Sequence, residues 1–432
     1  MKAGKWLPEP DRSRFSSGAE PVVRSSTARP VSLLRSLRCR LGPPVVFVGA
    51  FYVGFVTLRL LEYDVIWFVH LGRVMLESST TSSILTPDLG WQSEIGYDGQ
   101  YYYAIAVDPA NASDYITGSN AGYVYSRPVF PAVSRIVALG RVELVPYTML
   151  LVNLGAVLLG TLAVAGWLRR NGSSPWLSVL FGLYPGLVFS VFRDLTEPLA
   201  YGLVAIALWL FDPKDRQRVL MAGAILALAA LTRETVVVFS LVAAVALFAT
   251  GAVDGQRLWS WSRWRAPSGF LVLTVAPLLV WKAIVAAVLD VFTQETPGGA
   301  AALIPFYGIA SYWPWDAQHI LVVTAVIAPA LLAVLLALRL LAGSGPRLYG
   351  VLLILNAAAF VVFLPSAVYV DFGAAGRAAT GLVLATVCCV PAWRALDGRM
   401  GPILLVCLMW SLPWYLVMAA TLGLPGLDLI TT

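Results

Sequence analysis

Charged residues are scarce in this chain. Only 12% of its 432 residues are Asp, Glu, Lys or Arg, roughly half of the ~25% that is usual in a soluble domain. Mean hydropathy is correspondingly high, at +0.77. This composition excludes a soluble enzyme, a disordered protein and a nucleic-acid-binding domain, although the formal net charge is +6. The basic residues are scattered between apolar stretches, which is typical of a membrane protein that keeps arginine on one side of the bilayer.

Histidine and cysteine are also rare. The two histidines, His70 and His319, lie far apart in the chain, and no His/Cys cluster has the spacing of a zinc site. Because the cysteines fall in apolar stretches or on the predicted cytoplasmic side, no disulfide framework is expected. The four cysteines are Cys39, Cys388, Cys389 and Cys407.

Long apolar stretches dominate what remains. A stretch of roughly 20 apolar residues is enough to cross a bilayer as a helix. The sequence therefore predicts an all-α polytopic membrane protein with about eleven transmembrane helices, within a range of 9–13. The predicted spans are 44–62, 146–168, 175–192, 196–211, 218–232, 235–251, 268–290, 319–342, 347–366, 378–396 and 402–424.

The distribution of basic residues predicts the orientation. With the N-terminus in the cytoplasm, most Lys and Arg fall in the N-terminal arm or in even-numbered connections, as the positive-inside rule requires. Residues 1–42 are rich in Arg, Ser and Pro and lack an apolar core, which predicts a disordered basic cytoplasmic arm. Residues 43–426 are interpreted as one integral membrane domain, with a long outer loop at 63–145.

The outer loop contains an acidic and aromatic segment, Gly96-Tyr-Asp-Gly-Gln-Tyr-Tyr-Tyr103, with Asp98 between Tyr97 and Gly99. An apolar run follows and predicts an amphipathic helix on the membrane surface. A carboxylate beside aromatic rings at this depth suits the binding of a sugar. The alternative is a turn aspartate before a helix of the aromatic belt.

Ionisable residues cluster in the other predicted outer connections. Arg127 precedes a second predicted interfacial helix at 131–140, and either binds a phosphate or snorkels. The remaining residues have two possible interpretations: they face a functional cavity, or they form local ion pairs, such as Arg193 with Asp194 or Glu197, or Arg377 with Asp371. These residues are Arg193, Asp194, Glu197, Arg233, Glu234 and Arg377. A connection at 291–318, rich in Gly, Pro and aromatics, is interpreted as a lid or a plain outer loop.

The first-loop segment Gly-Tyr-Asp-Gly-x-Tyr-Tyr-x-x-Ile-Ala resembles the loop of GT-C superfamily glycosyltransferases, in particular bacterial proteins similar to PIG-V-type mannosyltransferases. The segments 194–198 and 231–235, and Gly376-Arg377, agree with it in kind and order, and the resemblance covers roughly residues 45–400. It implies a GT-C fold and a polyprenyl-phosphate hexose donor, with an outward-facing site whose catalytic aspartate corresponds to Asp98. Many relatives carry a second acid beside the first, whereas Asp98 is flanked by Tyr97 and Gly99. Dependence on a divalent metal therefore stays open.

On this hypothesis Asp98 is the general base of an inverting transfer, and a phosphate leaving group needs no protonating acid. Arg377, with Arg127 and Arg193 as further candidates, would bind the donor phosphate. Tyr101 and Tyr102 would line the sugar pocket, and the acidic residues Asp194, Glu197 and Glu234, together with Arg233, would orient these groups.

The expected partners are membrane lipid, the lipid-linked donor and a glycan, lipid or protein acceptor, but no nucleic acid. The expected location is a bacterial plasma membrane with the active site outside. The competing hypotheses are a transporter or flippase of lipid-linked sugars, and a membrane protein without catalytic activity.

Overall fold

The chain is described here from a computed structural model. The structure describes residues 40–78, 85, 89–114, 116, 120–253, 260–289, 304–343, 347–399 and 401–423. Most of the predicted arm at 1–42 and much of the predicted lid at 291–318 lie outside these residues. Within them the fold is all-helical, and the only β-type pairing is an isolated bridge between Gly72 and Ser93.

Helices account for almost every apolar stretch. Those of the first half are α2 (Gly42–Leu60), α3 (Arg73–Ser78), α4 (Asp98–Val107), α5 (Asn120–Tyr125), α6 (Val129–Val137), α7 (Val145–Arg170), α8 (Val179–Gly182), α9 (Pro185–Phe192), α10 (Glu197–Leu210) and α11 (Arg216–Thr232). Those of the second half are α12 (Val237–Val253), α13 (Trp261–Leu289), α14 (Tyr307–Ala310), α15 (Ala317–Val322), α16 (Ala328–Ala342), α17 (Arg347–Ala357), α18 (Phe372–Ala378), α19 (Thr380–Asp397) and α20 (Gly401–Gly423). Short 3₁₀ or π-helical turns join several of them, including η2 (Val65–Phe68), η6 (Pro175–Ser178), η7 (Glu234–Val236), η9 (Val323–Ile327), η10 (Ala358–Val362) and η11 (Ser366–Val368).

Five helical segments of the described chain are long and apolar enough to cross a membrane. They are Gly42–Leu60, Val142–Arg170, Glu234–Gly251, Trp261–Leu289 and Ala317–Ala342. Two bent pairs raise the number to seven: Pro175–Gly182 with Pro185–Phe192, and Phe372–Ala378 with Thr380–Leu396. The predicted spans 196–211, 218–232 and 347–366 are helical but shorter, whereas 402–424 corresponds to α20, which has 23 residues. Helix α10, for example, has 14 residues, which reach about 21 Å at 1.5 Å per residue, less than the ~30 Å of a hydrocarbon core.

The helix ends alternate between two ends of the molecule. Arg170, in the last turn of α7, donates to the carbonyl of Trp209 near the end of α10. Arg394, near the end of α19, donates to the carbonyl of Gly172 at 3.1 Å. The connections after α7, α10 and α19, which the sequence predicts to lie on the basic side, therefore meet at one end. The connections that carry Asp98, Glu197 and Arg233 meet at the other end, as described below.

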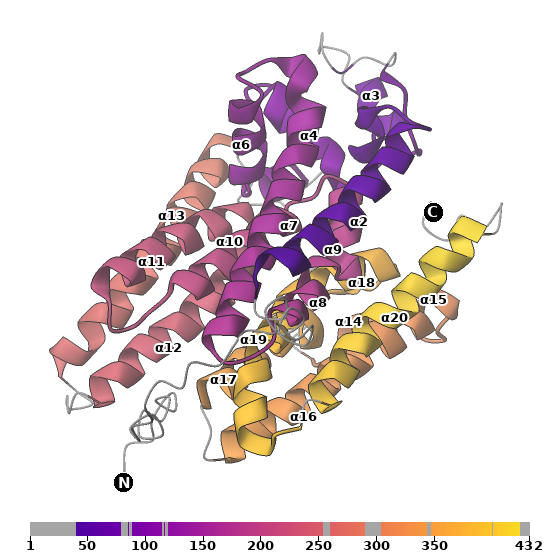
Figure 1. Cartoon of the computed structure of the whole chain (residues 1–432). Helices are drawn as coiled ribbons and strands as arrows, with labels where there is room; N and C mark the ends of the chain where they lie inside the picture. Colours follow the sequence, from indigo (N-terminus) through magenta and orange to yellow (C-terminus); the bar gives the residue numbers. More distant parts are fainter. Residues whose placement is uncertain are drawn as a thin grey trace, which may run out of the picture.

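The segment between α2 and α7 forms a separate layer at that other end, where α3, α4 and α6 gather (Figure 1). Helix α4 lies where the sequence predicts a helix, but it is not the expected amphipathic surface helix. Eight of its ten residues are buried, because α6 and α7 pack against it. The apolar run after Asp98 therefore forms a small core of its own, together with Val69, Leu71 and Phe130.

The two bent helix pairs contact each other. Helices α9 and α18 pack together, and the Tyr184 hydroxyl donates to the Gly376 carbonyl at 2.8 Å. A Cβ on Gly186 would lie 2.5 Å from that same oxygen, so glycine permits the close approach. Arg377 follows directly in α18, and this contact fixes the backbone that carries it.

Candidate functional site

Two irregular segments between α2 and α4, residues 70–72 and 95–97, position Asp98. The backbone N–H of Tyr97 donates to the His70 carbonyl at 3.0 Å. The Gln100 side chain accepts from the Gly72 N–H at 2.8 Å and donates to the Ile95 carbonyl at 2.9 Å. These bonds hold residues 70–72 against 95–100. The start of α4 is therefore positioned by backbone and amide hydrogen bonds, without help from a charged side chain.

Asp98 is the first residue of α4. At this position a carboxylate is favoured by the positive end of the helix dipole. Gly99 follows because the helix start touches another connection: a Cβ there would lie 2.1 Å from the Arg193 carbonyl and 2.9 Å from that of Val69. The glycine thus permits close approach of the helix start to backbone of the protein itself.

Asp98 forms an ion pair with Arg377. Its Oδ2 atom lies 2.9 Å from an Arg377 guanidinium nitrogen, across 279 positions of sequence. The ring of Tyr97 lies against the same guanidinium, 5.2 Å from its carbon. Burial disfavours the ionised carboxyl, but the charge and hydrogen bond of Arg377 outweigh it, so the pKa of Asp98 lies below its usual value.

Arg377 also approaches a second carboxylate. Glu197, the first residue of α10, has an Oε1 atom 3.7 Å from Arg377 and 2.9 Å from Arg233. The Glu197 side chain has no exposed surface, whereas that of Asp98 is 29% exposed. Asp98, Arg377, Glu197 and Arg233 therefore form a continuous row of alternating charge, and Asp98 is its most exposed member.

A second ion pair lies beside this row. Arg127 binds Glu234 through two nitrogens, at 2.7 and 3.0 Å, and donates to the Tyr102 hydroxyl at 3.0 Å. The ring of Tyr123 covers the guanidinium, 3.9 Å from its carbon. This bidentate geometry ties the outer layer to the turn between α11 and α12, because Arg127 and Glu234 are 107 residues apart.

A cavity of about 290 Å³ opens at the Asp98–Arg377 pair. It is lined by Ile95, Gly96, Tyr97, Asp98, Gln100, Tyr101, Ala367, Val370, Asp371, Ala374 and Arg377. Of the two tyrosines expected in a sugar pocket, Tyr101 lines it, but Tyr102 does not. Adjacent residues of a helix point about 100° apart, and Tyr102 faces Arg127 in the interior.

Three expected members of the site lie elsewhere. Arg193 lies 2.7 Å from Nδ1 of His70, and its guanidinium packs over the ring of Phe192, 5.0 Å from the centroid. Asp194 is fully buried and accepts from Asn153 at 3.4 Å. Arg127, held by Glu234, is likewise outside the cavity lining. Of the three arginines expected to bind a phosphate, only Arg377 lines this cavity.

Arg377 and Arg233 each pair with a distant carboxylate. Arg377 pairs with Asp98 while Asp371 caps α18 through the Ala374 N–H, at 2.6 Å. Arg233 pairs with Glu197. Such partners come from connections far apart in the sequence, so nearest-neighbour reasoning does not find them.

The sequence interpretation also missed several residues of the site. Tyr97 and Asp371 line the cavity, and Tyr123 covers Arg127. Tyr97 is adjacent to Asp98, and Asp371 lies shortly before Arg377. Their closeness in sequence to these two candidates is the signal that could have identified them. His70 had no signal except its rarity.

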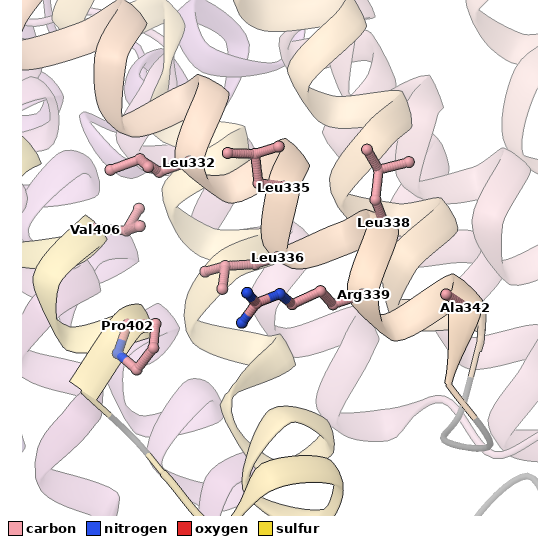
Figure 2. A pocket seen from close by; sticks show the side chains of 8 residues that line it. All are labelled: Leu332, Leu335, Leu336, Leu338, Arg339, Ala342, Pro402 and Val406. Atoms are coloured by element: carbon pink, nitrogen blue, oxygen red, sulfur yellow. The ribbon is translucent and has the colours of Figure 1, made fainter.

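Among the described residues, no three His, Cys, Asp or Glu side chains come together as a metal site. The described cysteines, Cys388, Cys389 and Cys407, are buried and free. A larger cavity of about 510 Å³ lies between α16 and α20. Figure 2 shows it lined by leucines with the Arg339 side chain lying across it. None of its lining residues comes from the elements that carry the charged row, so the smaller cavity is the candidate site.

No family model, curated protein or solved structure matches the chain.

Proposed function

We propose that the chain is a membrane glycosyltransferase of the GT-C type. It moves a hexose such as mannose from a polyprenyl-phosphate sugar to a glycan, lipid or protein acceptor, on the extracytoplasmic face of a bacterial plasma membrane. The observation that carries this proposal is that Asp98 and Arg377, contributed by α4 and α18, meet in one cavity. A base and a phosphate ligand are the two groups that such a transfer needs.

The proposed reaction inverts the anomeric carbon. The acceptor oxygen attacks this carbon and loses its proton to Asp98, while the bond between the carbon and the phosphate oxygen breaks. The electron pair of that bond leaves with the polyprenyl phosphate, whose charge Arg377 stabilises. Tyr97 and Tyr101 line the cavity and supply aromatic faces for the sugar. Glu197 keeps Arg377 in place, and Asp98 later returns its proton to water.

Replacing Asp98 with Asn tests the base directly. The purified variant, in lipid nanodiscs with labelled polyprenyl-phosphate hexoses and an acceptor extract, is expected to lose about 100-fold or more in turnover, as is typical of a missing general base. Glu94→Gln is the matched control, because Glu94 belongs to the same loop but pairs with Arg73 on the surface. Undiminished turnover of Asp98→Asn would remove this residue from the base role.

The proposal includes about eleven membrane crossings. The turn holding Arg193 and Glu197 and the turn holding Arg233 and Glu234 meet at one end, since Arg233 pairs with Glu197. Helices α10 and α11 therefore run away from that end and return to it as a packed pair.

A transporter of lipid-linked sugars is the second candidate. The two bent helix pairs, at 48° and 44°, favour it, because transporters commonly build sites from interrupted helices. Reconstituted vesicles separate the two functions: a transporter moves a fluorescent polyprenyl-phosphate sugar across the bilayer without any acceptor. A transferase leaves its distribution unchanged and consumes it only when the acceptor is added.

A further inference from the structure

We propose that the ion pair between Asp98 and Arg377 is a latch that the donor opens: the donor phosphate takes the place of the Asp98 carboxylate on Arg377 and thereby frees the base. This inference rests on the proposed function and adds an order of events to it. The donor binds first, and the site becomes competent for the acceptor only afterwards.

The charge balance of the cluster requires an exchange. It contains three carboxylates and three guanidiniums, which are paired with one another. They are Asp98, Glu197, Glu234, Arg127, Arg233 and Arg377. A phosphate added to this balanced set would leave a partly buried negative charge without a counter-charge, which is costly. One carboxylate must therefore release its guanidinium as the phosphate arrives.

Asp98 is the carboxylate best placed to leave. It is 29% exposed, lines the cavity and meets Arg377 through one oxygen. Glu197 has no exposed surface and lies between two guanidiniums, and Glu234 is held by two hydrogen bonds from Arg127. Glu234 is 26% exposed, but it does not line the cavity. Of the three carboxylates, only Asp98 can therefore give up its guanidinium to a phosphate in the cavity and turn to solvent or to an acceptor hydroxyl.

Arg377 keeps its position when Asp98 leaves. Glu197 lies 3.7 Å from the same Arg377 nitrogen that binds Asp98, and the Tyr97 ring lies against the guanidinium. The guanidinium has five N–H donors in a fixed planar fork, so it keeps Glu197 and Tyr97 as neighbours while it donates to a phosphate. The exchange is thus a side-chain rotation of Asp98 rather than a rearrangement of helices.

The exchange also resolves a chemical difficulty. While Arg377 holds it, Asp98 has a pKa below its usual value and is a weak base. Once the cation is neutralised by phosphate, and a second negative charge lies nearby, the carboxylate becomes more basic. The base is therefore strongest when the donor is in place.

Binding of polyprenyl phosphate, the product without a sugar, tests the latch without relying on catalysis. The full chain in nanodiscs is titrated with it, and the dissociation constants of variants are compared. Because Asp98→Asn removes the competing anion, we expect this variant to bind about five- to tenfold tighter than the wild type, the size of a partly exposed ion pair. Arg377→Lys is expected to bind more weakly. The two partners of one ion pair thus shift the affinity in opposite directions, which a purely structural pair would not do.

Asp371→Asn is the matched control. Asp371 lines the same cavity, and Asn also caps helices well, so only the charge is removed. The latch is supported if the affinity for polyprenyl phosphate rises clearly more in Asp98→Asn than in Asp371→Asn. Equal tightening in both, or none in Asp98→Asn, overturns it and leaves the transferase proposal standing. Failure of the wild type to bind polyprenyl phosphate at all, in folded protein, overturns both.

Discussion

The ionisable side chains of the outer end are arranged in pairs whose members come from different connections. Removing one partner of a buried pair typically costs roughly 3–5 kcal/mol, because the other charge is left uncompensated. Asp98 is partly exposed, whereas Glu197 and Arg127 are almost completely buried. Substitutions at Asp98 are therefore the ones that report on chemistry with the least damage to the fold.

His70 shows how the same region constrains protonation. Its ring is buried and accepts from Arg193, 2.7 Å from Nδ1. Burial, and next the charge of Arg193, lower the pKa of His70 from 6.5 to about 3. Its backbone has a φ of 58°, a conformation that Asn tolerates better than most residues.

We predict that His70 makes the protein sensitive to acid. Between pH 6.5 and about 3 the unfolded chain binds a proton that the folded chain does not. The contribution of neutral His70 to the free energy of unfolding is therefore fully present above pH 6.5. It decreases on acidification, by up to about 1.4 kcal/mol per pH unit. Thermal unfolding midpoints measured from pH 7.5 to 5 should fall less steeply in His70→Asn than in the wild type. Identical slopes would show that another group is responsible.

At the scale of elements, α4 depends on a contact that its own sequence does not explain. Its first turn touches the carbonyls of Arg193 and Val69 at Gly99. Helix α4 thereby locks to the connection between α9 and α10, which also begins the helix carrying Glu197. The spacing between the two carboxylates of the charged row is set by this backbone contact.

Gly99→Ala is expected to destabilise the protein by about 1–3 kcal/mol, because a Cβ 2.1 Å from the Arg193 carbonyl forces the helix start to move. The shift also separates Asp98 from Arg377, so transfer should fall further than stability does. Gly155→Ala in α7 is the control, since its Cβ would meet nothing within 4 Å and Ala favours a helix. Turnover equal in both variants would contradict this role for Gly99.

The sequence predicted the helices well, because apolar run length depends only on local residues. It did not predict the bends. The break between α8 and α9 lies inside a continuous apolar stretch, and its local signals are Pro185 and the flanking glycines Gly182 and Gly186. Among the candidate residues, Asp98 and Arg377 both line the cavity of about 290 Å³, and their role there stays a prediction. The contacts of Arg193, Tyr102 and Arg127 depend on which distant side chains fill the space around them, which run length does not encode.

At the scale of the whole molecule, the two ends differ in character. The layer of α3, α4 and α6 lies at one end (Figure 1), and the charged row begins there at Asp98, the first residue of α4. Arg170 and Arg394, near the ends of α7 and α19, bind backbone carbonyls at the other. Positive charge at helix C-termini of one end is consistent with the predicted cytoplasmic side.

Single-cysteine labelling tests this orientation. In a background without the native cysteines, Asn111→Cys in the outer layer should react with a membrane-impermeant maleimide in intact cells. Lys214→Cys, in the exposed turn between α10 and α11, should react only after permeabilisation. The opposite pattern would place the Asp98 cavity in the cytoplasm and would exclude an extracytoplasmic transfer.

The ion pair that closes the cavity also has a consequence for biogenesis. Arg377 is synthesised 279 residues after Asp98, which at roughly 5–20 residues per second is an interval of about 14–56 s. By the end of that interval the layer of α3, α4 and α6 and most of the other helices have been synthesised. Asp98 and Glu197 still lack the guanidinium of Arg377. The charge set of this cluster is therefore complete only when the helix segment that carries Arg377 has been inserted.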